Sequence, residues 1–246
     1  MPHAVSQLRA ERLARSAKPF LARGGSRRAH CPGCRLVPSH CICALRPLCG
    51  TRAGVCLLMH DIEPLKPSNT GWLIADVVKD THAFGWSRTE MDPQLEALLA
   101  DPQWQPYVVF PGEFVQPPHR VVHTLPVPQA AVMPGQERRP LFILLDATWP
   151  EARKMFRKSP YLERLPVLSL HGDAASRYRL RRSTRGDHFC TSEVAAQCLA
   201  LAGDARAGAL LQAWLDLFSE RYLQAREQRP ADADSAAHRQ LRALRS

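Results

Sequence analysis

The stretch Leu141-Phe-Ile-Leu-Leu-Asp-Ala-Thr-Trp-Pro-Glu-Ala-Arg-Lys-Met-Phe-Arg-Lys158 decides how this chain folds. Its first five residues are apolar, which is typical of a strand buried on both faces. Thr148 is a favourable helix N-cap, and Glu151, three residues later, completes a capping box. Apolar side chains then recur at helical spacing until Ser159-Pro160 ends the pattern. The stretch therefore predicts a strand, a turn and a helix, followed by another strand over 165–170.

Asp146 lies just past the carboxyl end of the predicted strand, where open α/β sheets bind their ligands. An aspartate there could also simply close the strand and help to cap the helix. Thr148 and Trp149 add a hydroxyl group and a large flat ring to the same tight turn. This combination favours a functional site.

Two more apolar runs, Val55 to Met59 and Tyr107 to Phe110, predict buried strands that end in polar turns. The first turn leads into a helix from about Gly71, for which Asn69 or Thr70 is the expected N-cap. The second turn is Pro111-Gly112-Glu113. Further helices are predicted over 92–100, 193–201 and 205–224. Strands that alternate with helices predict an α/β fold, with a mostly parallel sheet flanked by helices.

The 246 residues carry a formal net charge of +10 and 45% apolar residues. We expect one large domain plus a small appendage, and a polyanionic partner, nucleic acid before membrane. No stretch approaches the length of a transmembrane helix, and the first residues lack the apolar core of a signal peptide. We therefore expect a cytoplasmic protein with no membrane partner.

Four of the eight cysteines, Cys31, Cys34, Cys41 and Cys43, lie within thirteen residues. Pro32-Gly33 supplies the tight turn that a Cys-x2-Cys knuckle needs to aim two thiolates at one ion. The spacing predicts a structural zinc held by these four sulfurs, with His40 as a substitute ligand. An iron–sulfur cluster is the competing interpretation. The other cysteines are interpreted as small buried apolar residues.

The composition suggests four parts of the chain. Residues 1–28 form a basic arm, either flexible or in contact with RNA, and residues 29–50 form the zinc knuckle. Residues 51–226 form the α/β domain, and residues 227–246 form a frayed polar tail. The proline-rich stretch 116–135 is expected to cross the surface in an extended form.

The segment 176–182, Ser-Arg-Tyr-Arg-Leu-Arg-Arg, interleaves arginines with an aromatic ring. This pattern favours nucleic-acid binding, although a solvated face would have a similar composition.

Five motifs follow one another along the chain: His60-x2-Glu63 with Asn69-Thr-Gly71, Phe110-Pro-Gly-Glu113, Asp146-Ala-Thr-Trp149, Ser176-Arg-Tyr-Arg-Leu-Arg181 and Cys190-Thr-Ser-Glu193. In this order, and with the cysteine knuckle before them, they resemble the DTW-domain family of tRNA-uridine aminocarboxypropyltransferases. The chain departs from the family pattern at Lys66, where arginine is usual, and at Ser68 and Val194, where threonine and alanine are usual. Lysine keeps the charge but loses the bidentate fork with which arginine clamps a carboxylate.

The resemblance implies a SPOUT-like fold in which turns at strand ends bind S-adenosylmethionine. It also implies transfer of the 3-amino-3-carboxypropyl group to N3 of an unpaired uridine in tRNA, with release of methylthioadenosine. In this interpretation Asp146 is the general base, Thr148 fixes Asp146, and Trp149 stacks on a base or on adenine. The implied cofactor-binding residues are Asn69, Thr70, Pro111, Gly112, Glu113, Asp146 and Trp149, and the implied RNA-binding residues are Arg177, Tyr178, Arg181, Arg182, Thr191 and Glu193.

Two other functions are compatible with the sequence. One is an S-adenosylmethionine-dependent RNA methyltransferase, and the other is a non-catalytic zinc-knuckle RNA-binding protein. A methyltransferase would release S-adenosylhomocysteine instead of methylthioadenosine. A non-catalytic RNA-binding protein would bind tRNA but not S-adenosylmethionine. We expect no obligate protein partner.

Overall fold

The computed structural model describes residues 2–17, 29–126, 138–170 and 189–245. Its six strands form one sheet in the order β2-β1-β5-β3-β6-β4, and every neighbouring pair is parallel. Parallel neighbours require crossover connections, which place helices on both faces. The predicted α/β fold is therefore confirmed. The strands are β1 (Gly54–Met59), β2 (Thr81–Gly85), β3 (Trp104–Val109), β4 (Val121–Val122), β5 (Arg139–Asp146) and β6 (Val167–Leu168).

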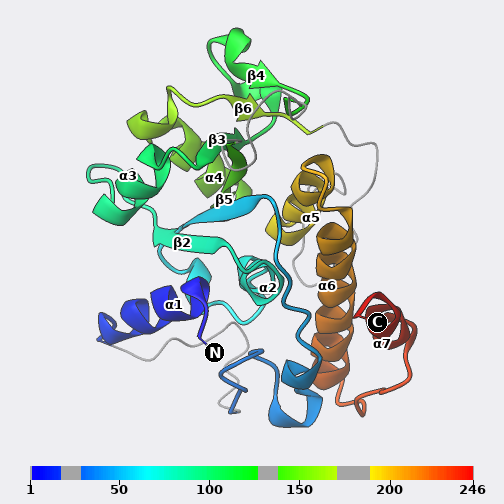
Figure 1. The fold of residues 1–246 in the computed structure, drawn as a ribbon. Coiled ribbons are helices and arrows are strands. Elements are labelled where there is room, and N and C mark those ends of the chain that lie inside the picture. Colours follow the sequence, from blue (N-terminus) through cyan, green and yellow to red (C-terminus); the bar gives the residue numbers. More distant parts are fainter. Residues whose placement is uncertain (1, 18–28, 127–137, 171–188, 246) are drawn as a thin grey trace.

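Figure 1 shows helices on both sides of this sheet. Buried residues of α1, α2, α5, α6 and α7 belong to the apolar core on one face, and those of α3 and α4 belong to the core on the other. Residues of β5 alternate between the two cores, so this strand is buried on both faces, as its apolar run predicts. The helices are α1 (Ala4–Ala14), α2 (Gly71–Val77), α3 (Pro93–Ala100), α4 (Trp149–Arg157), α5 (Thr191–Leu201), α6 (Ala205–Arg226) and α7 (Ala236–Arg245).

The neighbouring strands β1 and β5 send their helices to opposite faces of the sheet. Buried α2 residues, which follow β1, join one core, and those of α4, which follows β5, join the other. Met59 at the end of β1 is in register with Asp146 at the end of β5. In open α/β sheets, ligands bind at the carboxyl ends of the strands where the winding direction changes. The topology thus places Asp146 at this point.

Both ends of the chain are more ordered than the sequence suggests. Residues 4–14 of the expected arm form α1, in which Val5 and Leu8 are buried. In the expected frayed tail, α7 packs along α6 and buries His238 and Leu241. Both helices pack a few apolar residues against the rest of the protein, which supplies stability that local propensity does not.

Other differences concern the sheet. Strand β2 was not predicted, and β6 is shorter than the expected 165–170. The described part of 116–135 is not a plain extended connection, because it contains a 3-10 turn and β4. Within the described residues, no helix is long and apolar enough to cross a membrane.

Candidate functional site

Asp146 is the centre of a buried polar network. Its side chain is 1% exposed. One carboxylate oxygen, Oδ2, accepts a hydrogen bond from Nδ2 of Asn69 at 2.6 Å, and Oδ1 accepts one from the Thr191 hydroxyl at 2.6 Å. The backbone oxygen of Asp146 accepts from the amide of His60 at 3.0 Å. The carboxylate is therefore held from two sides by segments far away in sequence.

Asn69 joins the turn after β1 to this network. Its side chain is fully buried, and its Oδ1 accepts a hydrogen bond from the amide of Trp72 at 3.0 Å, inside the first turn of α2. The sequence predicts Asn69 or Thr70 as the N-cap; Thr70 occupies that position without a side-chain hydrogen bond, and Asn69 supplies the capping bond. Its Nδ2 also lies 3.4 Å from Oε2 of Glu63, which forms an ion pair with Lys66. Capping fixes the Asn69 side chain with its amide toward Asp146.

Gly71 allows α2 to approach the carboxylate. A Cβ atom built at this position would lie 2.6 Å from Oδ2 of Asp146. That distance is too short for any side chain, so the close approach requires glycine. Thr70, the residue before it, is 4% exposed and is the N-cap of α2.

Thr191 and Glu193 lie at the start of α5. Thr191 donates to Asp146, as described above. Glu193 is 4% exposed, and its Oε2 accepts from the amide of Cys190 at 2.8 Å, which closes a capping box. Glu193 thus caps α5, and the implied RNA-binding role of Thr191 and Glu193 stays a prediction. Burial raises the pKa of the Cys190 thiol, so this cysteine stays protonated and is a poor candidate for a nucleophile.

Thr148 and Trp149 start α4 as the capping box predicts. The hydroxyl of Thr148 donates to Oε2 of Glu151 at 2.5 Å, and its amide donates to the same oxygen at 2.9 Å. Thr148 was expected to fix Asp146, but the hydroxyl that donates to Asp146 is that of Thr191. A hydroxyl group has a single proton to donate, and Glu151 takes that of Thr148.

Trp149 is half-buried in a cluster of aromatic rings. Its ring stacks on Phe110 with centroids 5.5 Å apart and planes 12° apart, and it meets Phe114 edge-on at 5.6 Å. Phe110 also stacks on Phe156 at 4.3 Å. The guanidinium of Arg153 lies 4.7 Å from the centroid of Phe114. This cluster provides a rigid aromatic wall beside the strand ends.

Pro111, Gly112 and Glu113 form the turn after β3, the strand next to β5. Pro111 and Glu113 are exposed, and the amide of Gly112 donates to the hydroxyl of Ser169 at 3.0 Å. Phe114 follows this turn, and its ring contacts the ring of Trp149. The three predicted turns, 60–71, 111–113 and 146–149, therefore follow the carboxyl ends of adjacent parallel strands, as expected.

The groups at this edge match the chemistry of S-adenosylmethionine. Asp146 and Glu113 are carboxylates suited to an ammonium group. Trp149 offers an aromatic face for a purine ring. The amide of Asn69 and the hydroxyl of Thr70 add polar groups at the same turn.

The four cysteine sulfurs fit a zinc ion. All four Sγ atoms lie within 4.8 Å of one another. Individual separations are 3.5 Å for Cys31 and Cys43, 3.8 Å for Cys34 and Cys41, and 3.6 Å for Cys31 and Cys41. A tetrahedron with Zn–S bonds of about 2.3 Å has sulfurs about 3.8 Å apart. The predicted ligand set is thus brought together, whereas Nε2 of His40 donates to the backbone oxygen of Arg229 at 3.0 Å.

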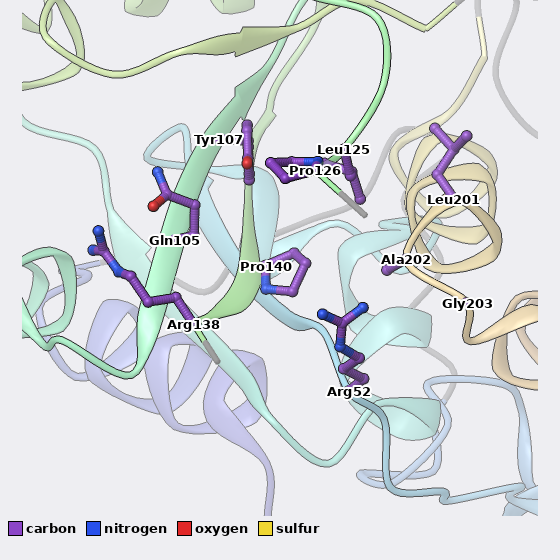
Figure 2. A pocket seen from close by; sticks show the side chains of 10 residues that line it. All are labelled: Arg52, Gln105, Tyr107, Leu125, Pro126, Arg138, Pro140, Leu201, Ala202 and Gly203. Atoms are coloured by element: carbon purple, nitrogen blue, oxygen red, sulfur yellow. The ribbon is translucent and has the colours of Figure 1, made fainter. Parts of the chain in front are cut away.

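Two cavities of the described residues lie away from Asp146. One, of about 500 Å³, lies at the amino ends of the strands, where Figure 2 shows Arg52, Gln105 and Arg138. The other, of about 720 Å³, separates α1 from the cysteine module and includes His3, Arg9, Arg35 and Trp72. Neither is the site that the strand-end motifs predict.

Arg177, Tyr178, Arg181 and Arg182 lie outside the described residues. The described elements before and after them in the chain are β6 and α5. The first residue of α5, Thr191, donates a hydrogen bond to Asp146. The prediction that these four residues bind RNA stays a prediction.

Sequence reasoning did not identify the role of Thr191 or the need for glycine at 71. The Thr–Asp contact joins residues 45 positions apart, so no local pattern indicates it. The Asn69-Thr-Gly71 motif at a helix start was the available signal for Gly71, but it gave no reason why a glycine is needed there.

Comparisons with known proteins agree with this geometry. A family model described as DTW domain matches residues 28–223. A stretch of 59 residues is 39% identical to tRNA-uridine aminocarboxypropyltransferase 2 of Drosophila melanogaster, and it spans 24% of this chain and 24% of that protein. No solved structure matches. Because the family model covers most of the chain, including every described motif at the strand ends, the protein belongs to the DTW domain family.

Proposed function

We propose that this protein transfers the 3-amino-3-carboxypropyl group of S-adenosylmethionine to N3 of an unpaired uridine in tRNA, releasing methylthioadenosine. The observation that carries the proposal is the buried carboxylate of Asp146, held by Asn69 and Thr191 where the strand-end turns meet. Membership of the DTW domain family and the similarity to a named tRNA-uridine aminocarboxypropyltransferase support it.

S-adenosylmethionine would supply an electrophilic methylene carbon next to its sulfonium. The new bond joins N3 of uridine to that carbon, while the carbon–sulfur bond breaks and its electrons go to sulfur. The N3 proton must leave for N3 to become a good nucleophile, so a base is needed. N3 lies on the pairing edge of uridine, so the uridine must be unpaired or flipped out.

Asp146 is the proposed base. An ionised carboxylate can take up a proton, and Oδ2 and Oδ1 of Asp146 accept hydrogen bonds from Asn69 and Thr191. The two donors also fix the orientation of the carboxylate, which reduces the reorganisation that proton transfer requires.

The remaining roles follow from the chemistry of the turns. Trp149 would stack on adenine or on the uridine, and Glu113 or Asp146 would bind the ammonium group. Asn69, Thr70, Pro111 and Gly112 would complete the cofactor pocket. A zinc ion in the cysteine module would serve structure, because four thiolates leave no open coordination position.

Exposed cations next to the aromatic wall support a polyanionic substrate. The face of α4 that carries Arg153, Lys154, Arg157 and Lys158 is solvent-exposed. Phosphate groups of an RNA backbone bind to such an exposed group of cations. Together with 177–182, this face is the proposed tRNA contact.

The decisive experiment is mass spectrometry of tRNA nucleosides after incubation with the protein and S-adenosylmethionine, with the nucleoside by-product identified in parallel. We expect an aminocarboxypropyl adduct on uridine and methylthioadenosine. S-adenosylhomocysteine and a methylated nucleoside would instead identify a methyltransferase. Binding of tRNA without binding of S-adenosylmethionine would identify a non-catalytic RNA-binding protein.

A further inference from the structure

The loop over residues 63–69 connects β1 to α2 and carries Asn69, the residue that donates to Asp146. Most of its backbone carbonyls accept hydrogen bonds from side chains outside the loop. Two arginines supply these donors, Arg9 of α1 and Arg35 of the cysteine module. The acceptors are the carbonyl oxygens of Pro64, Leu65, Lys66, Pro67 and Asn69.

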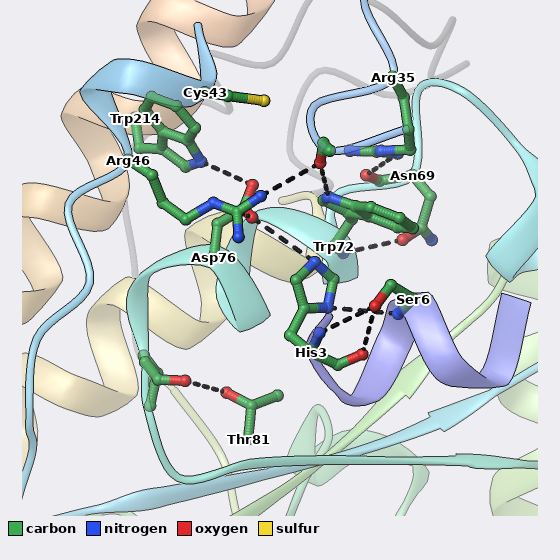
Figure 3. Close-up of polar contacts among 12 residues, drawn as sticks. His3, Ser6, Arg35, Cys43, Arg46, Asn69, Trp72, Asp76, Thr81 and Trp214 are labelled. Atoms are coloured by element: carbon green, nitrogen blue, oxygen red, sulfur yellow. Dashed lines mark hydrogen bonds and ion pairs between the residues drawn. The ribbon is translucent and has the colours of Figure 1, made fainter. Parts of the chain in front are cut away.

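Arg35 is the more constrained of the two arginines. It follows Cys34 directly, is 4% exposed and has a φ of 65°, a backbone conformation that costs energy for a residue other than glycine. Its Nη1 donates to the carbonyl oxygens of Pro67 at 2.8 Å and Asn69 at 2.9 Å. Figure 3 shows its guanidinium beside Trp72 and Asn69.

Aromatic rings hold the Arg35 guanidinium in place. Its central carbon lies 4.6 Å from the ring centroid of Trp72 and 5.2 Å from that of Phe218. The indole N–H of Trp72 in turn donates to the carbonyl oxygen of Gly33, inside the cysteine knuckle, at 3.0 Å. The knuckle, Arg35 and the start of α2 thus form one packed unit.

Arg9 reaches the same loop from a different element. Its Nη1 donates to the carbonyl oxygens of Pro64 at 3.0 Å and Leu65 at 2.7 Å. Helix α1 lies before residue 28, where the family match begins, so this contact is an addition to the DTW domain. His3 anchors the start of α1 against Trp72, with ring centroids 4.5 Å apart.

We propose that Arg9 and Arg35 are positioning residues that hold loop 63–69, and through Asn69 orient the carboxylate of Asp146. This inference rests on the proposed function. The cysteine module then acts on the reaction at a distance, because metal binding by Cys34 fixes the backbone from which Arg35 extends. Displacement of a reacting group by about 1 Å can lower a rate about 100-fold.

The test replaces each arginine by methionine, which keeps a long apolar chain but removes the donors. Arg139→Met is the matched control. Arg139 also lies over a tryptophan, 4.4 Å from the centroid of Trp104, and donates to the carbonyl oxygens of Thr51 and Arg52, but at the opposite edge of the sheet. All three variants should lose comparable thermal stability.

Only Arg9→Met and Arg35→Met should slow the single-turnover transfer at saturating S-adenosylmethionine and tRNA, by about 10- to 100-fold. Amide hydrogen exchange should rise over 63–69 in these two variants and stay unchanged there in the control. Arg35→Lys should recover part of the rate, because its ammonium keeps donors for these carbonyls but lacks the planar guanidinium that packs on Trp72 and Phe218. Rates that fall equally in all three methionine variants would overturn the proposal.

A double-mutant cycle separates positioning through Asn69 from a general structural effect. If Arg35 acts through Asn69, Arg35→Met in an Asn69→Ala background should lower the rate by less than about threefold. If the two substitutions lower the rate multiplicatively, Arg35 does not act through Asn69, and the proposed pathway is wrong. Removal of metal by a chelator should also raise exchange over 63–69 in the wild type. If the wild type transfers nothing, the proposed function fails, and the exchange measurements still decide whether the arginines hold the loop.

Discussion

Nδ2 of Asn69 lies 2.6 Å from Oδ2 of Asp146, although the two residues are 77 positions apart in the chain. The contact joins the turn after β1 to the turn after β5. The helices that follow these two strands, α2 and α4, pack on opposite faces of the sheet. Thr191 completes the arrangement from α5. Three segments that share no local sequence pattern therefore fix one carboxylate.

Asp146→Asn is expected to lower single-turnover transfer by about 10²–10⁴, the usual contribution of a general base. Asparagine preserves the size of the side chain but cannot take up the N3 proton. Affinities for S-adenosylmethionine and tRNA should stay close to those of the wild type. Rate, cofactor affinity and melting temperature are measured on the same preparation.

Asp92→Asn is the control, because Asp92 caps α3 by accepting from the amide of Gln94, and asparagine caps equally well. A large loss of cofactor affinity in Asp146→Asn, with a normal rate at saturation, would assign Asp146 to the ammonium group instead. A fall in melting temperature alone would make it a structural strand terminator.

Gly71→Ala should abolish most activity while leaving the chain folded. The added Cβ would lie 2.6 Å from Oδ2 of Asp146, so the carboxylate must shift out of its contact with Asn69. Gly50→Ala is the matched control, since its Cβ would have no heavy atom within 4 Å. Equal rates in the two variants would show that the position of this carboxylate does not matter for the reaction.

Much of the framework was predictable from local patterns. The apolar run 141–145 predicted β5, and Thr148 with Glu151 predicted the start of α4. Once three strands end in polar turns, a parallel sheet brings those turns to one edge. The grouping of Asn69, Gly112 and Asp146 at that edge was therefore foreseeable.

The partners of Asp146 were not predictable in the same way. Thr191 looks like an ordinary residue of a helix start, and only the packing of α5 brings it to the carboxylate. Helix α1 has a weak apolar pattern, and its burial of Val5 depends on a surface made by other elements. Tertiary packing overrode local propensity in both cases.

Cys34→Ser should release metal and loosen the cysteine module while the parallel sheet stays folded. Serine offers a weaker ligand than a thiolate, and the buried Cys34 is one corner of the cluster. Metal analysis should find one zinc per chain in the wild type and in Cys49→Ser, a cysteine outside the cluster. Unchanged zinc in Cys34→Ser, or none in the wild type, would refute the assignment.

Stability should depend on pH through the start of α1. Burial lowers the pKa of His3 from 6.5 to about 3, with Arg46 and Arg35 nearby adding to the effect. The unfolded chain therefore binds a proton below pH 6.5 that the folded protein does not, so acidification favours unfolding. Burial raises the pKa of Asp76 to about 6, which gives the opposite dependence between pH 6 and 3.8.

His3→Asn isolates the first effect, because asparagine still caps α1 but does not titrate. Between pH 6.5 and 5 the variant should lose less stability than the wild type, by at most about 1.4 kcal/mol per pH unit. Asp76→Asn should lose more stability than the wild type on acidification below pH 6. Urea unfolding at several pH values measures both, and parallel curves for wild type and His3→Asn would contradict the assignment.

Replacement of Arg177, Arg181 and Arg182 by alanine should weaken binding to all tRNAs and reduce its dependence on salt. Each phosphate contact releases counterions, so loss of three contacts should lower the slope of log affinity against log salt by about two to three. The control variant replaces Arg239, Arg242 and Arg245 on α7, which removes the same charge from exposed positions on a different helix. Equal slopes in the two variants would mean that 177–182 contributes only to the overall charge of the protein, and the tRNA contact would then have to be sought on the basic face of α4.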